Sequence, residues 1–312
     1  HEPIVAAQKT LSKLAGSFAI AMLFAGYENL IIAARSGSPL AVGYGKNEMY
    51  LGSDALALLP MTKKITYLEE GDLAILTREG VEIYDHLGNF VSRPIKYLDQ
   101  SANFYDKSGF NHFMEKEIHE HPHAVGETFR QFIDYDIGII KISNLNLDFS
   151  KISKIHLIAC GTAYYSCLVG KYYFEQYSRI PVECDMASEF RYRDPVIDSN
   201  ALYIFVSQSG ETADTKAAVD YCRDRKIKTL SIVNVKNSSI ARDSDYCLYT
   251  KAGAEIGVAS TKAFTAQLSV LLSMAIHLAT LKKSITIDDN KKICKEAMLA
   301  TQLLEQLSLI HI

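Results

Sequence analysis

From residue 151 onward, the chain alternates short apolar runs with segments of helical periodicity. The apolar runs stand at residues 155–160, 182–185, 201–206, 229–233 and 246–249. Strands that alternate with helices in this way form a parallel sheet with helices on both faces. Ligands of such sheets bind beyond the carboxyl ends of the strands. The sequence therefore predicts an α/β fold, and it directs attention to the turns that follow these strands.

The central run is followed by a turn rich in hydroxyl groups, Ser207-Gln208-Ser209-Gly210-Glu211-Thr212, and then by a helical segment at 213–225. A helix N-terminus offers unpaired N–H donors and partial positive charge to an anion. The turn contains no lysine, whereas loops that hold nucleoside triphosphates carry Gly-Lys-Ser/Thr. It therefore favours a small phosphate monoester. The alternative is that Thr212 caps the helix and the serines fill a tight turn.

Two further turns carry the same residue types. Gly161 and Thr162 follow the first strand, and residues 253–261 follow the last one. Because parallel strands end at one edge of the sheet, these hydroxyls are expected to converge there. No Gly-x-Gly-x-x-Gly follows the first strand, which weighs against a dinucleotide, and no cofactor is predicted.

Residues 1–98 show a different pattern. A helical start at 3–15 is followed by short strand-like runs separated by turn residues such as those at 26–29 and 86–89. This spacing predicts antiparallel sheets with little helix.

Residues 99–150 change in pattern again and are interpreted as a connector. A helix is expected at 109–121, stopped by Pro122. The series His119-x-His121-x-His123 lacks helical i, i+4 ligand spacing, so a solvated helix end is expected and no metal site is predicted. The tail from residue 288 is expected to be an amphipathic helix whose apolar stripe would favour association; its members are Ile293, Ala297, Ala300, Leu304 and Leu307.

Charge and cysteine content exclude several classes of protein. A net charge of -3 gives no bulk attraction to nucleic acid. The six cysteines contain no Cys-x-x-Cys and suit a reducing compartment. The longest apolar stretch, 268–281, is interrupted by polar residues and is too short to span a bilayer, so no membrane partner is expected. No signal peptide is visible, but the sequence begins with His1 rather than Met, so the true N-terminus is expected to lie upstream. The cytoplasm is the default location.

Several ordered segments together resemble one known family. Residues 160–162, 188–193, 207–215 and 255–264 resemble the first sugar isomerase (SIS) domain of the glucosamine-6-phosphate synthases. Residues 34–40 and 68–72 are similar to the later part of the glutaminase domain of that family, and residues 116–122 to its connector. The resemblance covers nearly the whole chain.

The resemblance implies a division of the chain. Residues 1–98 would be the C-terminal part of a type 2 glutamine amidotransferase domain, a partial Ntn-type sandwich, and 99–150 the connector. Residues 151–285 would be the first SIS domain, and 286–312 the start of the link to a second SIS domain.

The resemblance also implies a function. The family converts fructose 6-phosphate and glutamine to glucosamine 6-phosphate and glutamate, and its full-length members are expected to be homodimers. Its N-terminal cysteine nucleophile would lie upstream of His1, and the Glu, His and Lys of the isomerisation would lie beyond Ile312. This segment is therefore expected to bind fructose 6-phosphate or glucosamine 6-phosphate without carrying catalytic residues.

By the same resemblance, specific residues would contact the phosphosugar. The phosphate would be held by Ser207, Gln208, Ser209 and Thr212. The sugar would be lined by Thr162, Val258, Ala259 and Ser260. Ala163 departs from the family, which usually has serine there, and a hydroxyl contact would be lost. Lys262 is expected to be solvated or ion-paired.

Two other functions compete with this one. A non-catalytic sugar-phosphate sensor would use the same SIS domain, but a transcriptional sensor would carry a helix-turn-helix segment, and none is found. A stand-alone phosphosugar isomerase would have no use for residues 1–98.

Overall fold

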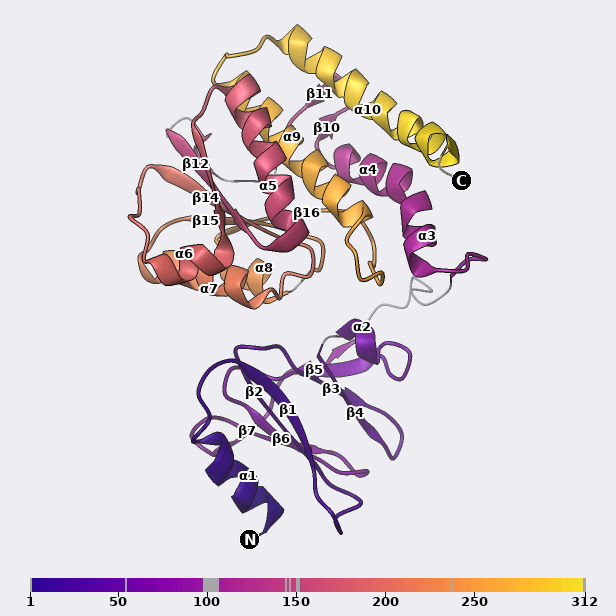
Figure 1. Ribbon diagram of the computed structural model, residues 1–312, viewed down its shortest axis with the longest axis vertical. Helices are drawn as coiled ribbons and strands as arrows, with labels where there is room; N and C mark the ends of the chain where they lie inside the picture. Colours follow the sequence, from indigo (N-terminus) through magenta and orange to yellow (C-terminus); the bar gives the residue numbers. More distant parts are fainter. Residues whose placement is uncertain are drawn as a thin grey trace. The chain divides into compact units, whose positions relative to one another are not determined.

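A computed structural model describes residues 2–53, 55–97, 107–143, 145, 147–149, 152–236 and 238–310. The chain divides into two compact units, His1–Phe104 and Tyr105–Ile312. Figure 1 shows the helices and strands of each unit.

The N-terminal unit contains two antiparallel sheets, as its strand spacing predicts. One has the order β1-β2-β6-β7-β8 and the other β4-β3-β5-β9. The elements in chain order are α1 (Pro3–Leu11), β1 (Phe18–Leu23), β2 (Ile31–Ser36), β3 (Ala41–Tyr44), β4 (Met49–Gly52), α2 (Ala55–Leu58), β5 (Lys64–Tyr67), β6 (Leu73–Leu76), β7 (Val81–Tyr84), β8 (Phe90–Val91) and β9 (Lys96–Tyr97).

The core of this unit lies between its two sheets. Val42 from one sheet and Ala74 from the other belong to the same buried cluster. Helix α1 covers the outer face of the first sheet through Ala7, which packs with Ile32 and Ile75. The unit is therefore a sheet-on-sheet sandwich, which is consistent with a glutaminase portion.

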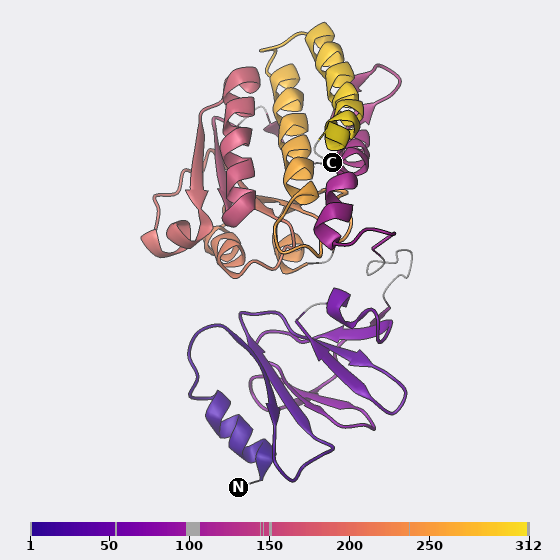
Figure 2. The same ribbon diagram turned by 45° about the vertical axis from the view of Figure 1, so that its right-hand side comes forward.

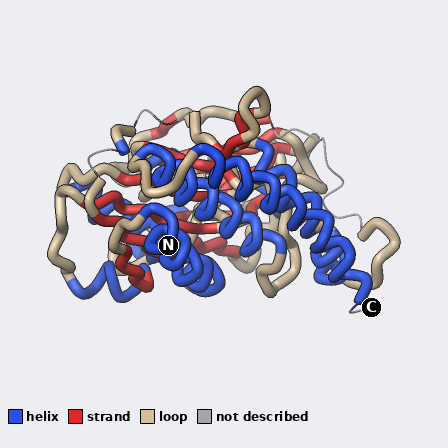
Figure 3. The backbone as a smooth tube through the Cα atoms, turned by 90° about the horizontal axis from the view of Figure 1, so that it is seen from above, coloured by secondary structure: helices blue, strands red, loops and turns tan. Residues whose placement is uncertain are grey.

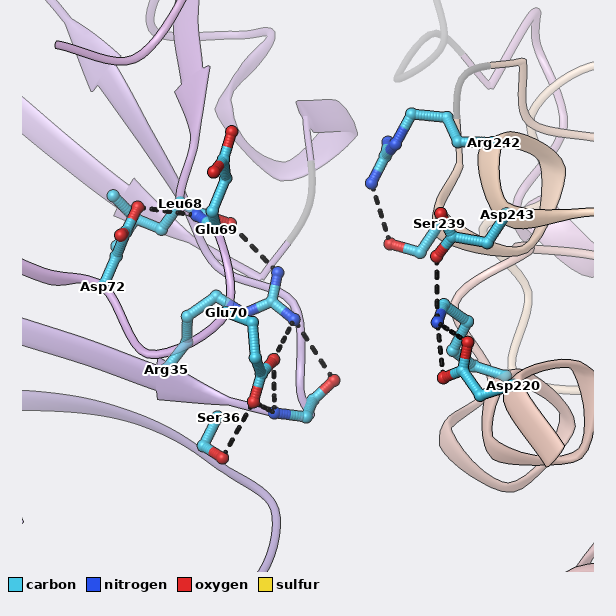
Figure 4. A network of polar contacts seen from close by, with 12 residues as sticks. Arg35, Ser36, Leu68, Glu69, Glu70, Asp72, Asp220, Ser239, Arg242 and Asp243 are labelled. Atoms are coloured by element: carbon cyan, nitrogen blue, oxygen red, sulfur yellow. Dashed lines mark hydrogen bonds and ion pairs between the residues drawn. The ribbon is translucent and has the colours of Figure 1, made fainter. Parts of the chain in front are cut away.

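The two upstream segments that carry the family resemblance lie together in this unit. The Glu70 carboxylate accepts hydrogen bonds from the Gly37 N–H at 2.9 Å and the Ser36 hydroxyl at 3.0 Å, and it pairs with Arg35 at 3.2 Å. Figure 4 shows these contacts. A cavity of about 590 Å³ lies nearby, lined by residues of α1 and the first sheet, and no predicted site residue lines it.

The second unit contains the predicted parallel sheet, with strand order β13-β12-β14-β15-β16 and every pair parallel. Its elements are α3 (Phe113–His119), α4 (His121–Arg130), β10 (Ile133–Asp134), β11 (Ile139–Ile140), β12 (Lys154–Ala159), α5 (Gly161–Tyr173), the π-helix η2 (Phe174–Ser178), β13 (Val182–Met186), α6 (Ala187–Arg193), β14 (Ala201–Ser207), α7 (Ala213–Asp224), β15 (Thr229–Val233), α8 (Ser239–Asp243), β16 (Tyr246–Tyr249), α9 (Lys262–Leu281) and α10 (Ile287–Ile310).

Helices cover both faces of this sheet, which confirms the predicted fold class. On one face, Cys167 of α5 and Leu271 of α9 pack on strand residues such as Leu157. On the other face, Phe190 of α6 and Val219 of α7 share a second core. Figures 2 and 3 show the two helical layers with the strands between them. Lys216 of α7 ties that helix to α8 through Asp243, at 2.9 Å, while also contacting Asp220 (Figure 4).

Helix α9 is the central helix of this unit. By length and composition this helix could cross a membrane. However, 67% of its most apolar 18-residue stretch is buried inside the protein. Val270 and Met274 are fully buried against the sheet. The helix is therefore explained as a core element.

The predicted helix at 109–121 differs from what the structure shows. Helix α3 ends at His119, and Pro122 lies in the first turn of a second helix, α4. A proline fits there because the first turn of a helix has no use for its missing N–H. His121 is also not a solvated helix end: its Nε2 is buried, and burial lowers its pKa.

The apolar stripe predicted on helix α10 is only partly exposed. Ala297 and Leu304 pack against Val125 and Phe129 of α4, and Ile293 packs on the main core, so the same chain covers three of the five residues of the stripe. Leu307 instead lies in an exposed row with Leu299 and Leu303, each about half exposed. Association of two copies stays a prediction.

The stability of the second unit is expected to fall as pH falls from about 6.5 towards about 4. Burial lowers the pKa of His277 from 6.5 to about 4. The unfolded chain then binds a proton that the folded chain excludes, so the free energy of unfolding is fully retained above 6.5 and decreases below it. Urea unfolding midpoints measured between pH 4 and 7.5 test this. A His277→Leu variant should show a flatter profile, and an unchanged profile would contradict the prediction.

Candidate functional site

The turn after β14 is held in shape by its own hydroxyl groups. Ser207 is 2% exposed. Its Oγ accepts a hydrogen bond from the Gly210 N–H at 3.0 Å and lies 2.9 Å from the Thr212 Oγ1. Thr212 is also the N-cap residue of α7, and its backbone is extended. The buried Ser207 hydroxyl therefore holds the backbone of Gly210 and the side chain of Thr212 in place.

Neighbouring segments fix the turn from the side of α8. The Gly210 carbonyl accepts a hydrogen bond from the Ile240 N–H at 3.0 Å, and the Glu211 carboxylate accepts one from the Ser239 N–H at 2.8 Å. Gly210 has a φ of +67°, and a Cβ there would lie 2.0 Å from the Ser238 Oγ. Only glycine fits this position without displacement of its neighbours.

Other polar groups of the turn keep bonding capacity. The Ser209 Oγ accepts a hydrogen bond from the Glu211 N–H at 3.1 Å, which leaves its hydroxyl hydrogen available to an acceptor. Gln208 and Ser209 are half-buried, as is Thr212. These are three of the four residues predicted to hold the phosphate.

The turn after β12 lies beside this one in the sheet. Strands β12 and β14 are neighbours, with Ala159 opposite Val206, and α5 begins at Gly161 with a φ of +57°. Thr162 is exposed in the first turn of α5. The N-termini of α5 and α7 therefore follow adjacent strands, which is the arrangement predicted for an anion site.

The loop at 250–261 contains the other predicted residues. Val258 and Ala259 are exposed, and Ser260 is half-buried. The Glu255 carboxylate accepts hydrogen bonds from the N–H groups of Thr261 at 2.8 Å and Ala263 at 3.2 Å, and so caps α9.

Asn234 is a structural residue that the sequence analysis did not single out. It follows β15, and its Oδ1 accepts hydrogen bonds from the Thr250 hydroxyl at 2.9 Å and the Ala252 N–H at 3.0 Å. Its Nδ2 donates to the Gly253 carbonyl at 2.6 Å. It therefore ties this loop to the sheet edge. In the sequence, only its position directly after a predicted strand indicated that Asn234 lies at this edge of the sheet.

Lys262 is ion-paired, as one of the two alternatives predicted, and is not solvated. It is 3% exposed, and its Nζ contacts a carboxylate oxygen of Glu120, which lies between α3 and α4. Its charge is therefore compensated within the protein.

The cysteines and the metal-ligating residue types are the groups that a nucleophile or a metal site would need. No group of three or more His, Cys, Asp or Glu side chains suited to a metal ion occurs in the described parts of the chain. All six cysteines are free. Burial raises the pKa of Cys184 to about 11 and of Cys222 to about 12, and it raises the pKa of Cys167, Cys247 and Cys294 as well. These five thiols are held in their unreactive, protonated form.

Comparison with known proteins identifies relatives along nearly the whole chain. Residues 148–277 match the SIS domain family. Glutamine–fructose-6-phosphate aminotransferase (isomerizing) of Mesorhizobium japonicum is 48% identical over 294 residues, which are 94% of this chain and 48% of the relative. The Brucella abortus protein of the same name is 50% identical over 283 residues, 91% of this chain and 47% of the relative.

A solved structure agrees with these relatives. The C-terminal domain of glucosamine-fructose-6-phosphate aminotransferase from Francisella tularensis is 40% identical, with a TM-score of 0.61, over 64% of this chain and 56% of that one. The chain spans about half the length of the curated relatives it matches. It is therefore homologous to about half of a glutamine–fructose-6-phosphate aminotransferase (isomerizing), and it contains the SIS domain of residues 148–277.

Proposed function

We propose that this chain binds a phosphosugar, fructose 6-phosphate or glucosamine 6-phosphate, at the carboxyl edge of its parallel sheet. The phosphate lies at the turn 207–212, and Thr162 with residues 258–260 lines the sugar. One observation carries the proposal: a hydroxyl-rich turn without lysine stands beside the N-termini of two long helices on adjacent strands. Such a turn suits a compact dianion better than a larger nucleotide.

In this proposal, the chain is a segment of the enzyme that forms glucosamine 6-phosphate from fructose 6-phosphate and glutamine, and the segment binds the sugar without transforming it. The protonated cysteines and the engaged carboxylates of Glu211 and Glu255 support this division. The unpaired state of the cysteines also fits the cytoplasm as the site of the reaction.

Ser209→Ala is expected to weaken binding of fructose 6-phosphate at least about tenfold. A hydrogen bond to a charged group contributes about 1.5 to 3 kcal/mol, and the Ser209 hydroxyl hydrogen is free to donate one. Isothermal titration calorimetry measures the change.

Ser153→Ala is the matched control. Ser153 hydrogen-bonds the Asn200 carbonyl, before β12 and β14 begin, at the opposite edge of the same sheet. The affinity of the Ser153→Ala variant for fructose 6-phosphate should match that of the wild type. Unchanged affinity in Ser209→Ala would contradict the assignment of the phosphate site.

A further inference from the structure

Glu117 of α3 holds the loop that follows β16 from outside the SIS segment. Glu117 is 2% exposed. Its Oε1 accepts hydrogen bonds from the N–H groups of Ile256 at 2.6 Å and Gly257 at 3.0 Å. The two partners lie 139 and 140 residues further along the chain. A carboxylate that accepts two backbone N–H groups fixes the orientation of two successive peptide units.

The fit between Glu117 and the loop is close. A Cβ at position 257 would lie 2.7 Å from the Glu117 Oε2, so a glycine is needed for the carboxylate to approach. That Oε2 atom is buried and has no hydrogen-bond partner in the described part of the protein. A buried carboxylate oxygen without a partner costs free energy. A side chain kept at such a cost calls for a role beyond packing.

The loop is anchored on both sides of its exposed tip. Glu117 holds residues 256 and 257 before the tip, and Glu255 holds Thr261 and Ala263 after it. Between these anchors, Val258 and Ala259 are exposed. The backbone of the tip is thereby presented in one conformation rather than left free.

We propose that Glu117 is the positioning residue for the sugar end of the ligand: it fixes the backbone of residues 256–260 so that this backbone contacts the sugar of a bound phosphosugar. The inference rests on the proposed function. Groups held in place before a ligand arrives lose less entropy on binding, and a small displacement of them weakens binding strongly. Among the described residues, Glu117 accepts hydrogen bonds from the loop, whereas the phosphate turn is held by Ser207, Ile240 and Ser239.

The test compares two ligands of the purified chain by calorimetry: fructose 6-phosphate, which reaches both the turn and the loop, and inorganic phosphate, which reaches the turn alone. Glu117→Ala is expected to weaken fructose 6-phosphate binding by about tenfold to a hundredfold. Phosphate affinity should change by less than about twofold, a difference within the ordinary error of such comparisons. Glu117→Gln keeps an acceptor oxygen for both N–H groups and should recover most of the affinity.

Glu127→Ala is the matched control. Glu127 lies on α4 and pairs with Arg130 at the surface, so its removal should leave both affinities unchanged. Hydrogen exchange gives a second readout, since the Ile256 and Gly257 amides should exchange faster in Glu117→Ala alone. If that variant does not fold, Gly257→Ala displaces the same carboxylate and should show the same selective loss.

The outcomes separate this inference from the proposed function. Wild-type affinity for fructose 6-phosphate in Glu117→Ala, or an equal loss for both ligands, would overturn the role of Glu117 and leave the phosphosugar site standing. A wild-type chain that binds neither ligand would overturn the proposed function, and the inference with it.

Discussion

Gly210→Ala is expected to lower the free energy of unfolding of the second unit by about 3 kcal/mol and to abolish phosphosugar binding. Two costs combine. A left-handed φ costs an L-residue about 1 to 2 kcal/mol, and Gly210 has a φ of +67°. The new Cβ would also lie 2.0 Å from the Ser238 Oγ, and overpacking of this kind costs about 1 to 3 kcal/mol. Relief of the clash requires the turn to part from α8, which removes the backbone geometry that an anion needs.

Gly138→Ala separates the two costs. Gly138 also has a positive φ, of +75°, but a Cβ there meets nothing within 4 Å. Its variant should show the backbone cost alone, with ligand binding unchanged. Urea unfolding and calorimetry with fructose 6-phosphate measure both effects. Equal destabilisation of the two variants, or retained binding in Gly210→Ala, would contradict the packing described around Ser238.

The purified chain is expected to form no glucosamine 6-phosphate from fructose 6-phosphate, with either glutamine or ammonium. Glutamine hydrolysis needs an activated nucleophile, and burial raises the pKa of five of the six cysteines. Isomerisation needs a base over the sugar carbons. Glu211 and Glu255 instead accept backbone hydrogen bonds, which commits them to holding turns.

The assay measures glucosamine 6-phosphate after long incubation, alongside thermal unfolding with and without the sugar. Ligand-dependent stabilisation without product is the expected result. Product from ammonium would reveal an essential base in this segment, and Glu255→Gln would then be the first variant to examine. Product from glutamine would contradict the conclusion about the cysteines.

The strands and the central turn could be predicted because their signals are local. The apolar runs at 155–160 and 201–206 match β12 and β14 within one residue, and the turn between Ser207 and Thr212 has the predicted place. Strands β8 and β9 were not predicted, because two residues carry no periodicity. The contacts of Glu255 with the start of α9 also span only six to eight residues.

The contacts that shape the rest of the site are distant in sequence. Nothing near Glu117 indicates that it reaches residues 256 and 257, and nothing near Asn234 indicates that it binds residues 250–253. The burial of Lys262 likewise depends on a distant residue, because its charge is paired with Glu120, 142 residues earlier. A single sequence reports propensity and periodicity, whereas these pairings depend on how the helices pack.

Because α4 and α10 pack on α9, the part of the chain that folds together is longer than the segment that matches the SIS family. The SIS match ends at residue 277, within α9, while Ala124 packs on Ala263 and Ala266, and Leu272 meets the cluster of α4 and α10. A protein trimmed to residues 148–277 would expose this apolar surface to water and lose the last turn of its central helix. An expressed form of the second unit therefore needs α3, α4 and α10 as well as the segment that matches the SIS family.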